Sequence, residues 1–216
     1  MIDKHELLSE IQLYVIADKK ICGGRDVEDV VRQAIEGGAQ MIQYRDKDAD
    51  DADFLSTASK LRAVCKNRGV PFIVNDRAEI AREVDADGVH VGQKDISINQ
   101  ARKILDPAKI VGESARTIHQ AKRAEEEGAD YVGVGPIFET PSKGIDKPVG
   151  LNIIREAREN LHIPFFPIGG INPKNVDQIV RAGGRRIAVI SAVVLAGDVR
   201  SAATELVKKL RQGSPI

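Results

Sequence analysis

The sequence predicts an α/β protein that folds as a single (β/α)8 TIM barrel. Short β-rich apolar runs alternate with longer segments whose apolar residues recur at three- and four-residue spacing, the pattern of strand–helix units around a parallel sheet. Runs such as YVGVG and IAVIS are apolar without alternation, as in strands covered on both faces. An open doubly wound sheet would also alternate strands and helices, but it gives no reason for eight units.

We expect one strand in each of eight units, with amphipathic helices between the strands and one more helix at the C-terminus. Glycine-containing segments before the second, sixth and eighth strands end a helix and turn the chain. The 216 residues form one domain with a short N-terminal extension over residues 1–12. The predicted strands are Leu13–Ala17, Met41–Tyr44, Pro71–Val74, Gly88–Val91, Ile110–Gly112, Tyr131–Val134, Phe165–Ile168 and Arg186–Ile190.

The composition favours a small-molecule partner. The 32 basic and 32 acidic residues balance, so no global field draws the protein to nucleic acid or to an anionic membrane. Cys22 and Cys65 lack metal-ligand spacing and are expected to be free thiols in a reducing compartment. The N-terminus lacks the features of a signal peptide, and the longest apolar stretch is shorter than the roughly 20 residues of a membrane helix. We expect a soluble, cytoplasmic protein and allow for a homo-oligomer.

Polar residues follow the predicted strands at the end where barrel enzymes place their chemistry. Asp76 and Asp95, after the third and fourth strands, are hard oxygen ligands suited to Mg²⁺, which takes one or two carboxylates together with waters and phosphate oxygens. Arg45, Lys47 and Lys143 would meet the remaining phosphate charge. The strand-end segments are Gln43–Lys47, Asn75–Arg77, Gly92–Asp95, Ser114, Thr140–Lys143, Gly169–Gly170 and Ser191.

A second anion site is predicted after the last two strands. Gly169-Gly170 and Ser191 follow strands seven and eight, where backbone N–H groups of short loops bind phosphate in many barrels. Glycine permits the close approach that such binding needs. Two anion sites, one with a metal and one without, would suit two phosphorylated substrates.

Each of these segments also has a plainer reading. Asn75-Asp76-Arg77 alone resembles a helix N-cap, the segment from Arg45 to Lys47 resembles an exposed charge run, and Thr140-Pro141-Ser142 resembles a surface turn. Their joint placement at one end of successive strands favours a site.

The four histidines divide into two groups. His5, His119 and His162 lie in predicted helices or linkers and are expected at the surface. His90 lies on the fourth predicted strand, where a packed interior side chain and a ligand contact remain equally open.

Six motifs in order, QYRDKD, VNDRAEIA, GVHVGQKD, DYVGVGPIFETPSK, IGGINPKNV and IAVISAV, resemble those of the thiamine-phosphate synthase family. The resemblance runs from about the first strand to the last barrel helix. It implies a barrel transferase that uses Mg²⁺ and joins 4-amino-2-methyl-5-pyrimidinylmethyl diphosphate to a thiazole phosphate or its carboxylate. It also implies a dissociative reaction in which pyrophosphate leaves before the thiazole nitrogen adds, so that no protein nucleophile is required.

The resemblance also implies roles for individual residues. Arg45, Lys47, Lys143 and Ser114 would act catalytically, and we expect Lys143→Ala to slow the chemical step more than it weakens thiazole binding. Asp76 and Asp95 would bind the metal. The substrate-binding residues would be Gln43 at the pyrimidine, Arg45, Lys47, Asn75 and Lys143 at the diphosphate, Ser114 at either, and Thr140, Ser142, Gly170, Ile190 and Ser191 at the thiazole phosphate.

Four positions depart from the family pattern. Asp46 replaces a usual glutamate and Ser142 a usual threonine, while Glu113 and Arg116 flank Ser114 where small apolar and histidine residues are common. We expect Glu113 to point away from Ser114 because neighbouring strand residues face opposite sides. A thiazole tautomerase-like paralogue, a non-catalytic thiazole-phosphate binder and another barrel enzyme are the alternatives. The segment Phe138–Val149 is long and glycine-containing enough to be a mobile lid that carries Lys143, and the sequence leaves open whether it is one.

Overall fold

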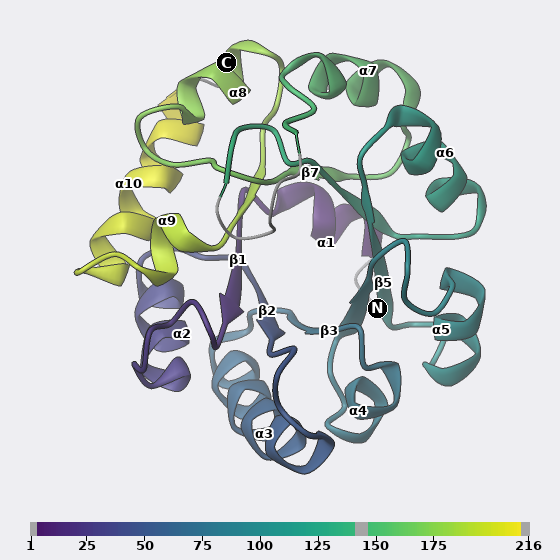
Figure 1. The fold of residues 1–216 in the computed structure, drawn as a ribbon, viewed down its shortest axis with the longest axis vertical. Coiled ribbons are helices and arrows are strands. Elements are labelled where there is room, and N and C mark those ends of the chain that lie inside the picture. The colour runs from purple at the N-terminus through teal and green to yellow at the C-terminus, as the bar shows by residue number, and fades with distance from the viewer. Residues whose placement is uncertain (1–3, 141–146, 213–216) are drawn as a thin grey trace.

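Eight parallel strands form a sheet that curves around the centre of the molecule, and helices surround it (Figure 1). The computed structural model describes residues 4–140 and 147–212. From β1 to β7 each strand pairs with the next along the chain, and β1 also pairs with β8. An isolated parallel bridge between Ile168 and Ala188 connects the end of β7 to β8 and closes the barrel. The predicted barrel is confirmed. The strands are β1 Leu13–Asp18, β2 Met41–Arg45, β3 Phe72–Asn75, β4 Gly88–Val91, β5 Ile110–Ala115, β6 Tyr131–Val134, β7 Phe165–Pro167 and β8 Ile187–Val189.

The largest difference from the predicted strand bounds is at β5, which continues three residues beyond Gly112. In this extension Ser114 pairs with Gly133 and Ala115 pairs with Val134. A prediction from apolar runs ends where polar residues begin, but backbone pairing continues through them. β5 thereby carries Ser114 into the end of the barrel.

Helices follow the strands, and side-chain caps fix where several of them begin. Asp50, Ser97 and Thr117 each accept a hydrogen bond from a backbone N–H in the first turn of the next helix, a common way to start a helix. The helices are α1 Lys4–Glu10, α2 Val27–Glu36, α3 Asp51–Arg68, α4 Ala78–Glu83, α5 Ile98–Ile104, α6 Ile118–Glu126, α7 Asn152–Asn160, α8 Val176–Arg181, α9 Ser191–Val194 and α10 Val199–Gln212.

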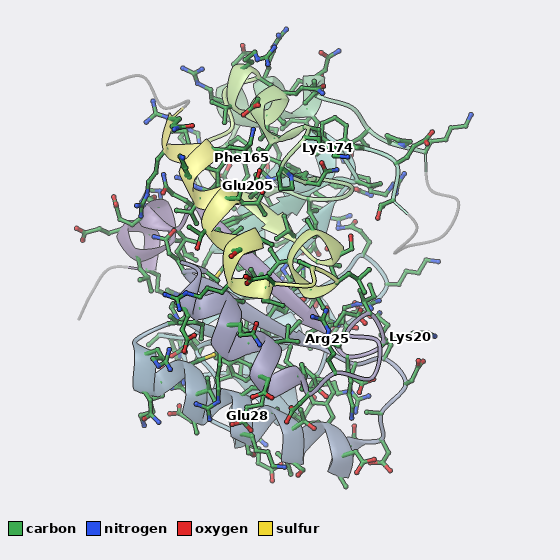
Figure 2. All side chains as sticks on the ribbon, turned by 90° about the vertical axis from the view of Figure 1, so that its left-hand side faces the viewer. Lys20, Arg25, Glu28, Phe165, Lys174 and Glu205 are labelled. Carbon is green, nitrogen blue, oxygen red and sulfur yellow. The ribbon has the colours of Figure 1, made fainter. Side chains whose placement is uncertain are left out.

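The last helix closes the outer ring by packing against the first helix that follows a strand. Figure 2 shows α10 beside α2, and the two helices are in contact. A Cβ on Gly37, directly after α2, would lie 2.4 Å from the carbonyl oxygen of Arg200, so a larger residue would push the helices apart. None of the helices in the described ranges is long and apolar enough to cross a membrane.

Two apolar cores lie on the two faces of the sheet. The larger packs the outward side chains of the strands against the helices, and both cysteines, Cys22 and Cys65, are free thiols buried within it. The smaller fills the barrel with alternate strand residues, among them Tyr14, Tyr131 and Phe166. Side chains of this inward-facing set emerge at the carboxyl ends of the strands.

Helix α1, within the predicted N-terminal extension, covers the amino-terminal end of the barrel (Figure 1). Leu8 and Ile11 pack into the interior core, and Arg186 donates a hydrogen bond of 2.9 Å to the carbonyl oxygen of Ser9. With this end covered, a ligand reaches the interior from the carboxyl end.

Candidate functional site

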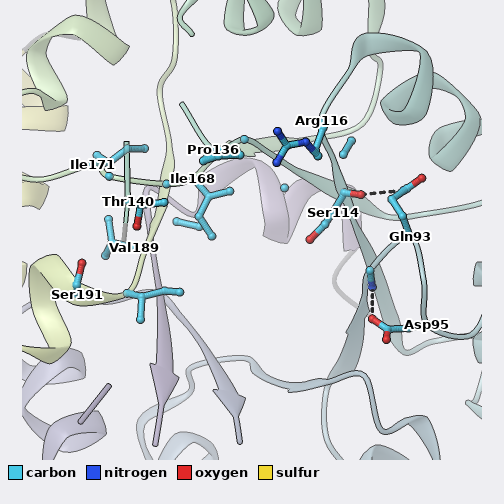
Figure 3. A pocket seen from close by; sticks show the side chains of 18 of the residues that line it. Gln93, Asp95, Ser114, Arg116, Pro136, Thr140, Ile168, Ile171, Val189 and Ser191 are labelled. Atoms are coloured by element: carbon cyan, nitrogen blue, oxygen red, sulfur yellow. Dashed lines mark hydrogen bonds between the residues drawn. The ribbon is translucent and has the colours of Figure 1, made fainter. Parts of the chain in front are cut away.

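A cavity of about 320 Å³ opens at the carboxyl ends of the strands. Figure 3 shows Asp95, Ser114 and Arg116 on one side of it and Thr140 and Ser191 on the other. The predicted site residues that line the cavity are Lys47, Asp95, Ser114, Thr140, Gly170, Ile190 and Ser191. Gln43, Arg45, Asn75 and Asp76 lie at the same end of the barrel but outside this lining. Ser142 and Lys143, with the middle half of the segment considered as a lid, lie outside the described residues.

Two carboxylates and an ammonium group meet beside the cavity. The Lys47 Nζ lies 2.9 Å from an Asp76 carboxylate oxygen. Burial raises the pKa of Asp76 above its ordinary value and the neighbouring Asp95 carboxyl raises it further, whereas Lys47 lowers it. Two like charges held together repel each other, and carboxylate oxygens are ligands that Mg²⁺ takes, so Asp76 and Asp95 are the residues here that could hold a cation.

Backbone conformation and backbone hydrogen bonds fix the positions of Asp76 and Asp95. Asp76 has a φ of 62°, in the left-handed region that aspartate tolerates better than most residues, and its N–H donates to the His90 carbonyl oxygen at 2.8 Å. Asp95 closes a turn by accepting from the N–H of Gly92 at 2.8 Å. A Cβ on Gly92 would lie 2.8 Å from that same carboxylate, so glycine leaves the room that Asp95 needs.

Arg45 is held by a carboxylate that sequence reasoning missed. Asp18 ends β1, directly beside Arg45 at the end of β2. The Arg45 guanidinium forms an ion pair with the Asp18 side chain, which is 2% exposed. The signal was present, because Asp18 ends the apolar run LYVIA at the same end as the other polar residues, but no role was assigned to it.

Hydrogen bonds run through the barrel interior between Gln43 and Ser114. The Gln43 amide nitrogen donates to the Tyr14 hydroxyl, which lies 2.9 Å from the Tyr131 hydroxyl. The His90 Nδ1 lies 3.0 Å from the Tyr131 hydroxyl oxygen, and the His90 Nε2 lies 2.9 Å from the Ser114 hydroxyl oxygen. His90 is therefore a buried interior side chain, the first of the two possibilities left open for it, and it also contacts Ser114, a predicted site residue. A contact between His90 and a ligand stays a prediction.

Asn75 lies in the same region. It ends β3, is 9% exposed and sits beside His90 of β4. The other three histidines, His5, His119 and His162, are exposed as predicted.

The loop after β7 shapes the other side of the cavity. Gly169 and Gly170 have φ values of 99° and 66°, a backbone conformation that glycine adopts without strain. The Gly170 carbonyl oxygen accepts hydrogen bonds from the side chains of Asn172 and Asn175. These hydrogen bonds fix the conformation of the loop after β7. Because its two glycines lack side chains, the loop leaves the cavity open next to Ile190 and Ser191.

Gly170→Ala is expected to weaken binding of a phosphorylated ligand by at least about tenfold. A Cβ there would lie 2.4 Å from the Glu139 carbonyl oxygen and 2.8 Å from the Phe138 Cβ, so the loop must shift. Gly69→Ala is the matched control, because its φ is 65° and nothing lies within 4 Å of the added Cβ. Calorimetric titration with inorganic phosphate and with thiazole phosphate measures the effect. Equal affinities for both variants and the wild type would contradict it.

Glu113 points away from the interior, as predicted. Its carboxylate accepts from the Gln93 amide at 2.8 Å and lies 3.6 Å from the guanidinium of Arg123 on α6. Burial raises the pKa of Glu113, and the hydrogen bond from Gln93 and the charge of Arg123 oppose that rise. Gln93 also donates to the Ser114 carbonyl oxygen, so Glu113 supports the site from outside the barrel.

The raised pKa of Glu113 gives a sign for its pH dependence. The folded protein binds the Glu113 proton more tightly than the unfolded chain does. The stability of the wild type therefore falls as the pH rises from the ordinary pKa of glutamate to the raised pKa of Glu113 in the fold. The unfolding free energy of Glu113→Gln relative to wild type should therefore rise with pH across that window and then level off. Urea unfolding at several pH values measures it, with Glu159→Gln, an exposed residue of α7, as control. A constant difference across the window would contradict the prediction.

Arg116 and Gln93 line the cavity, although neither was assigned a role. Arg116 donates from its guanidinium to the carbonyl oxygen of Lys147 at 3.0 Å, and its N–H donates to the Gln120 side chain. The resemblance leads us to expect a histidine at position 116, but this chain has an arginine there, at the edge of the cavity (Figure 3).

Comparison with known proteins finds close relatives across nearly the full chain. The family model for thiamine monophosphate synthase matches residues 13–193. Proteins named thiamine-phosphate synthase from Shouchella clausii and Moorella thermoacetica are 43% and 46% identical, covering 96% and 90% of this chain and 100% and 93% of their own lengths. A solved structure described as thiamine phosphate pyrophosphorylase from Pyrococcus furiosus superposes with a TM-score of 0.87 at 38% identity, covering 96% of this chain and 98% of its own.

Proposed function

Because this chain belongs to the thiamine monophosphate synthase family, we propose that it joins 4-amino-2-methyl-5-pyrimidinylmethyl diphosphate to a thiazole phosphate. The products are thiamine phosphate and pyrophosphate. The observation that carries the proposal is a single cavity with two different sides. Asp95 lies on one side, where Asp76 joins it to Lys47, and Thr140 and Ser191 lie on the other (Figure 3).

This division assigns one substrate to each side. The diphosphate, with the larger charge, belongs at Lys47, Arg45 and Asn75, and the pyrimidine ring lies toward Ser114 and Gln43. The thiazole phosphate belongs at Thr140, Gly170, Ile190 and Ser191, where backbone N–H groups and hydroxyls suit an anion without a metal. The two reacting ends then meet in the middle of the cavity. This proposal leaves Ser142 and Lys143 in the roles expected from sequence.

The facing carboxylates of Asp76 and Asp95 fit Mg²⁺. Among the described residues no three acidic, histidine or cysteine side chains converge on one point, but Mg²⁺ needs only one or two carboxylates when substrate phosphates and waters complete its shell. The raised pKa of Asp76 beside Asp95 supports a cation there. When bound, Mg²⁺ would offset negative charge on the departing diphosphate.

The protein's own task is to stabilise charge and to align the reactants. In the proposed reaction the bond between the pyrimidine methylene carbon and the diphosphate oxygen breaks, and its electron pair leaves with pyrophosphate. The lone pair of the thiazole nitrogen then forms the new carbon–nitrogen bond. Arg45 and Lys47 stabilise the charge that grows on the leaving group, and the Gly170 side holds the nitrogen in line.

The charged residues described on the diphosphate side favour a synthase over the alternatives. A non-catalytic thiazole-phosphate binder has no use for two facing carboxylates next to Lys47, and a tautomerase acting on the thiazole alone has none for the Asp18–Arg45 pair. Of these groups, Asp95 lies across the cavity from Thr140 and Ser191, which are on the side proposed for thiazole (Figure 3).

Genetic complementation tests this function. We expect expression of the chain in a bacterium that lacks its own thiamine-phosphate synthase to restore growth without added thiamine. Gly170→Ala should restore it less well than the control Gly69→Ala at equal expression. Failure of the wild-type chain to support growth, when an authentic synthase does so at the same protein level, would overturn the proposal.

A further inference from the structure

The hydrogen-bonded side chains between Gln43 and Ser114 are separated by long stretches of sequence, yet they form one unbroken series. The Tyr14 and Tyr131 hydroxyls lie 2.9 Å apart, although the two residues are 117 positions apart in the sequence. His90 continues from Tyr131 at 3.0 Å to Ser114 at 2.9 Å. We call these five side chains, Gln43, Tyr14, Tyr131, His90 and Ser114, the interior series.

The middle of the interior series is buried and closely packed. Tyr14 and Tyr131 are 1% and 0% exposed, and both pack edge-on against Phe166 with ring centroids 5.5 Å away. Burial raises the pKa of both phenols, so each keeps its hydrogen and has one to donate. Buried hydroxyls need partners, and here each tyrosine finds them only within the series among the described residues.

The bonds of the interior series have a direction. An amide nitrogen can only donate, so Tyr14 accepts from Gln43 and its own hydrogen goes to Tyr131. Tyr131 then donates to Nδ1 of His90, which leaves the imidazole hydrogen on Nε2 to donate to the Ser114 oxygen. In the opposite direction the Tyr14 hydrogen would have no acceptor among the described residues, which costs free energy for a buried hydroxyl.

This direction decides what Ser114 offers to a ligand. Its oxygen already accepts from His90, and the residue lines the cavity. Its own hydrogen has no acceptor among the described residues and can therefore be donated into the cavity.

We propose that Tyr14, Tyr131 and His90 are positioning residues that fix the Ser114 hydroxyl as a hydrogen-bond donor toward the cavity. The ligand group that Ser114 recognises is then an acceptor, such as a ring nitrogen or a diphosphate oxygen. The part that concerns turnover rests on the proposed function. The part that concerns the direction of the hydrogen bonds does not.

Nitrogen NMR of the histidine-labelled free protein tests the direction without substrate. His90, assigned by comparison with His90→Asn, should show an unprotonated Nδ1 and a protonated Nε2. In Tyr131→Phe the Nδ1 loses its partner in the series, and its resonance should shift markedly. The exposed His5, His119 and His162 provide internal references. A protonated Nδ1 in the wild type, or an unchanged His90 in the variant, would overturn the proposal.

Turnover tests the consequence. Tyr131→Phe should lower turnover with the pyrimidine substrate by about tenfold and leave the KM for thiazole phosphate unchanged. In a Ser114→Ala background the same change should have less than about a twofold further effect, since the two residues act together. The positioning role of Tyr131 would be contradicted if Tyr131→Phe lowered turnover by the same factor in the wild type and in Ser114→Ala. Wild-type turnover in Tyr131→Phe alone would contradict it as well.

Two further variants keep the test interpretable. Tyr44→Phe removes a phenol hydroxyl that is buried outside the barrel, against Phe54, and should leave turnover near wild type. Tyr14→Phe breaks the series one step earlier, so the free protein should then contain both His90 tautomers. This variant replaces Tyr131→Phe if Tyr131→Phe fails to fold. A single, unchanged His90 tautomer in Tyr14→Phe would count against the proposal. A wild-type protein without synthase activity would refute the proposed function and leave the NMR result to decide the direction.

Discussion

Asp76→Asn and Asp95→Asn are each expected to lower turnover by roughly 10²–10³-fold, the loss typical when one group that stabilises charge in the transition state is removed. Asparagine keeps the shape of each side chain, tolerates the φ of 62° at Asp76, and leaves an oxygen to accept from Gly92. The change therefore removes charge with little disturbance of the backbone. Turnover measured across a Mg²⁺ titration should show weaker magnesium dependence in both variants.

Stability separates this explanation from damage to the fold. Either substitution relieves the repulsion between Asp76 and Asp95. The Lys47–Asp76 ion pair that Asp76→Asn also loses is partly exposed, and such a pair contributes at most about 1 kcal/mol, so neither variant should unfold much more easily than the wild type in EDTA. Asp29→Ala, which removes an exposed carboxylate on α2, is the control for a lost charge. Wild-type turnover at low Mg²⁺ in Asp76→Asn and Asp95→Asn would refute the metal assignment.

Asp18→Asn is the second change with a large expected effect. It leaves the Arg45 guanidinium without its buried partner, and breaking such a pair costs roughly 3–5 kcal/mol of stability. Turnover should fall by about 10²-fold as well, because Arg45 is no longer held toward the diphosphate. Chemical denaturation and steady-state kinetics measure the two effects.

Asp48→Asn is the matched control for Asp18. Asp48 pairs with Lys20 at 3.1 Å, but its side chain is 68% exposed, and an exposed pair contributes at most about 1 kcal/mol. Combining Asp18→Asn with Arg45→Ala should lower turnover little beyond Arg45→Ala alone, since Asp18 acts through Arg45. Full additivity would show that Asp18 acts on the reaction by another route.

The sequence was sufficient for the fold because the strands carry a strong signal. β4 and β6 have the predicted bounds, since each is a short apolar run between polar or glycine-containing turns. The common end at which Lys47, Asp95, Ser114 and Ser191 lie also follows from the fold, because parallel strands place their carboxyl ends together.

The partners of the site residues could not be predicted in the same way. Asp18 meets Arg45 only because β1 and β2 pair in a particular register. Tyr14 and Tyr131 come from β1 and β6 and meet across the barrel interior, so their contact depends on the closure of the barrel. An apolar run such as LYVIA predicts a strand but does not say that its tyrosine hydroxyl bonds to a glutamine of the next strand.

The departures from the family pattern have different outcomes. Glu113 faces α6 and leaves the interior face to Ser114, so it brings no negative charge into the cavity. Asp46 is buried and accepts from the N–H groups of Asp48 and Ala49, so the shorter acid still shapes the loop after Lys47. Arg116 adds a cation at the cavity edge.

One measurement tests the central claim directly: the amounts of thiamine phosphate and pyrophosphate formed from the two purified substrates by the purified protein. We predict equal amounts of both products, dependence on each substrate and on Mg²⁺, and loss of both products when EDTA is added. Failure to form thiamine phosphate with a folded protein that binds both substrates would contradict the claim. Pyrophosphate released without thiamine phosphate would contradict it as well, because the chain would then cleave the diphosphate without joining the two rings.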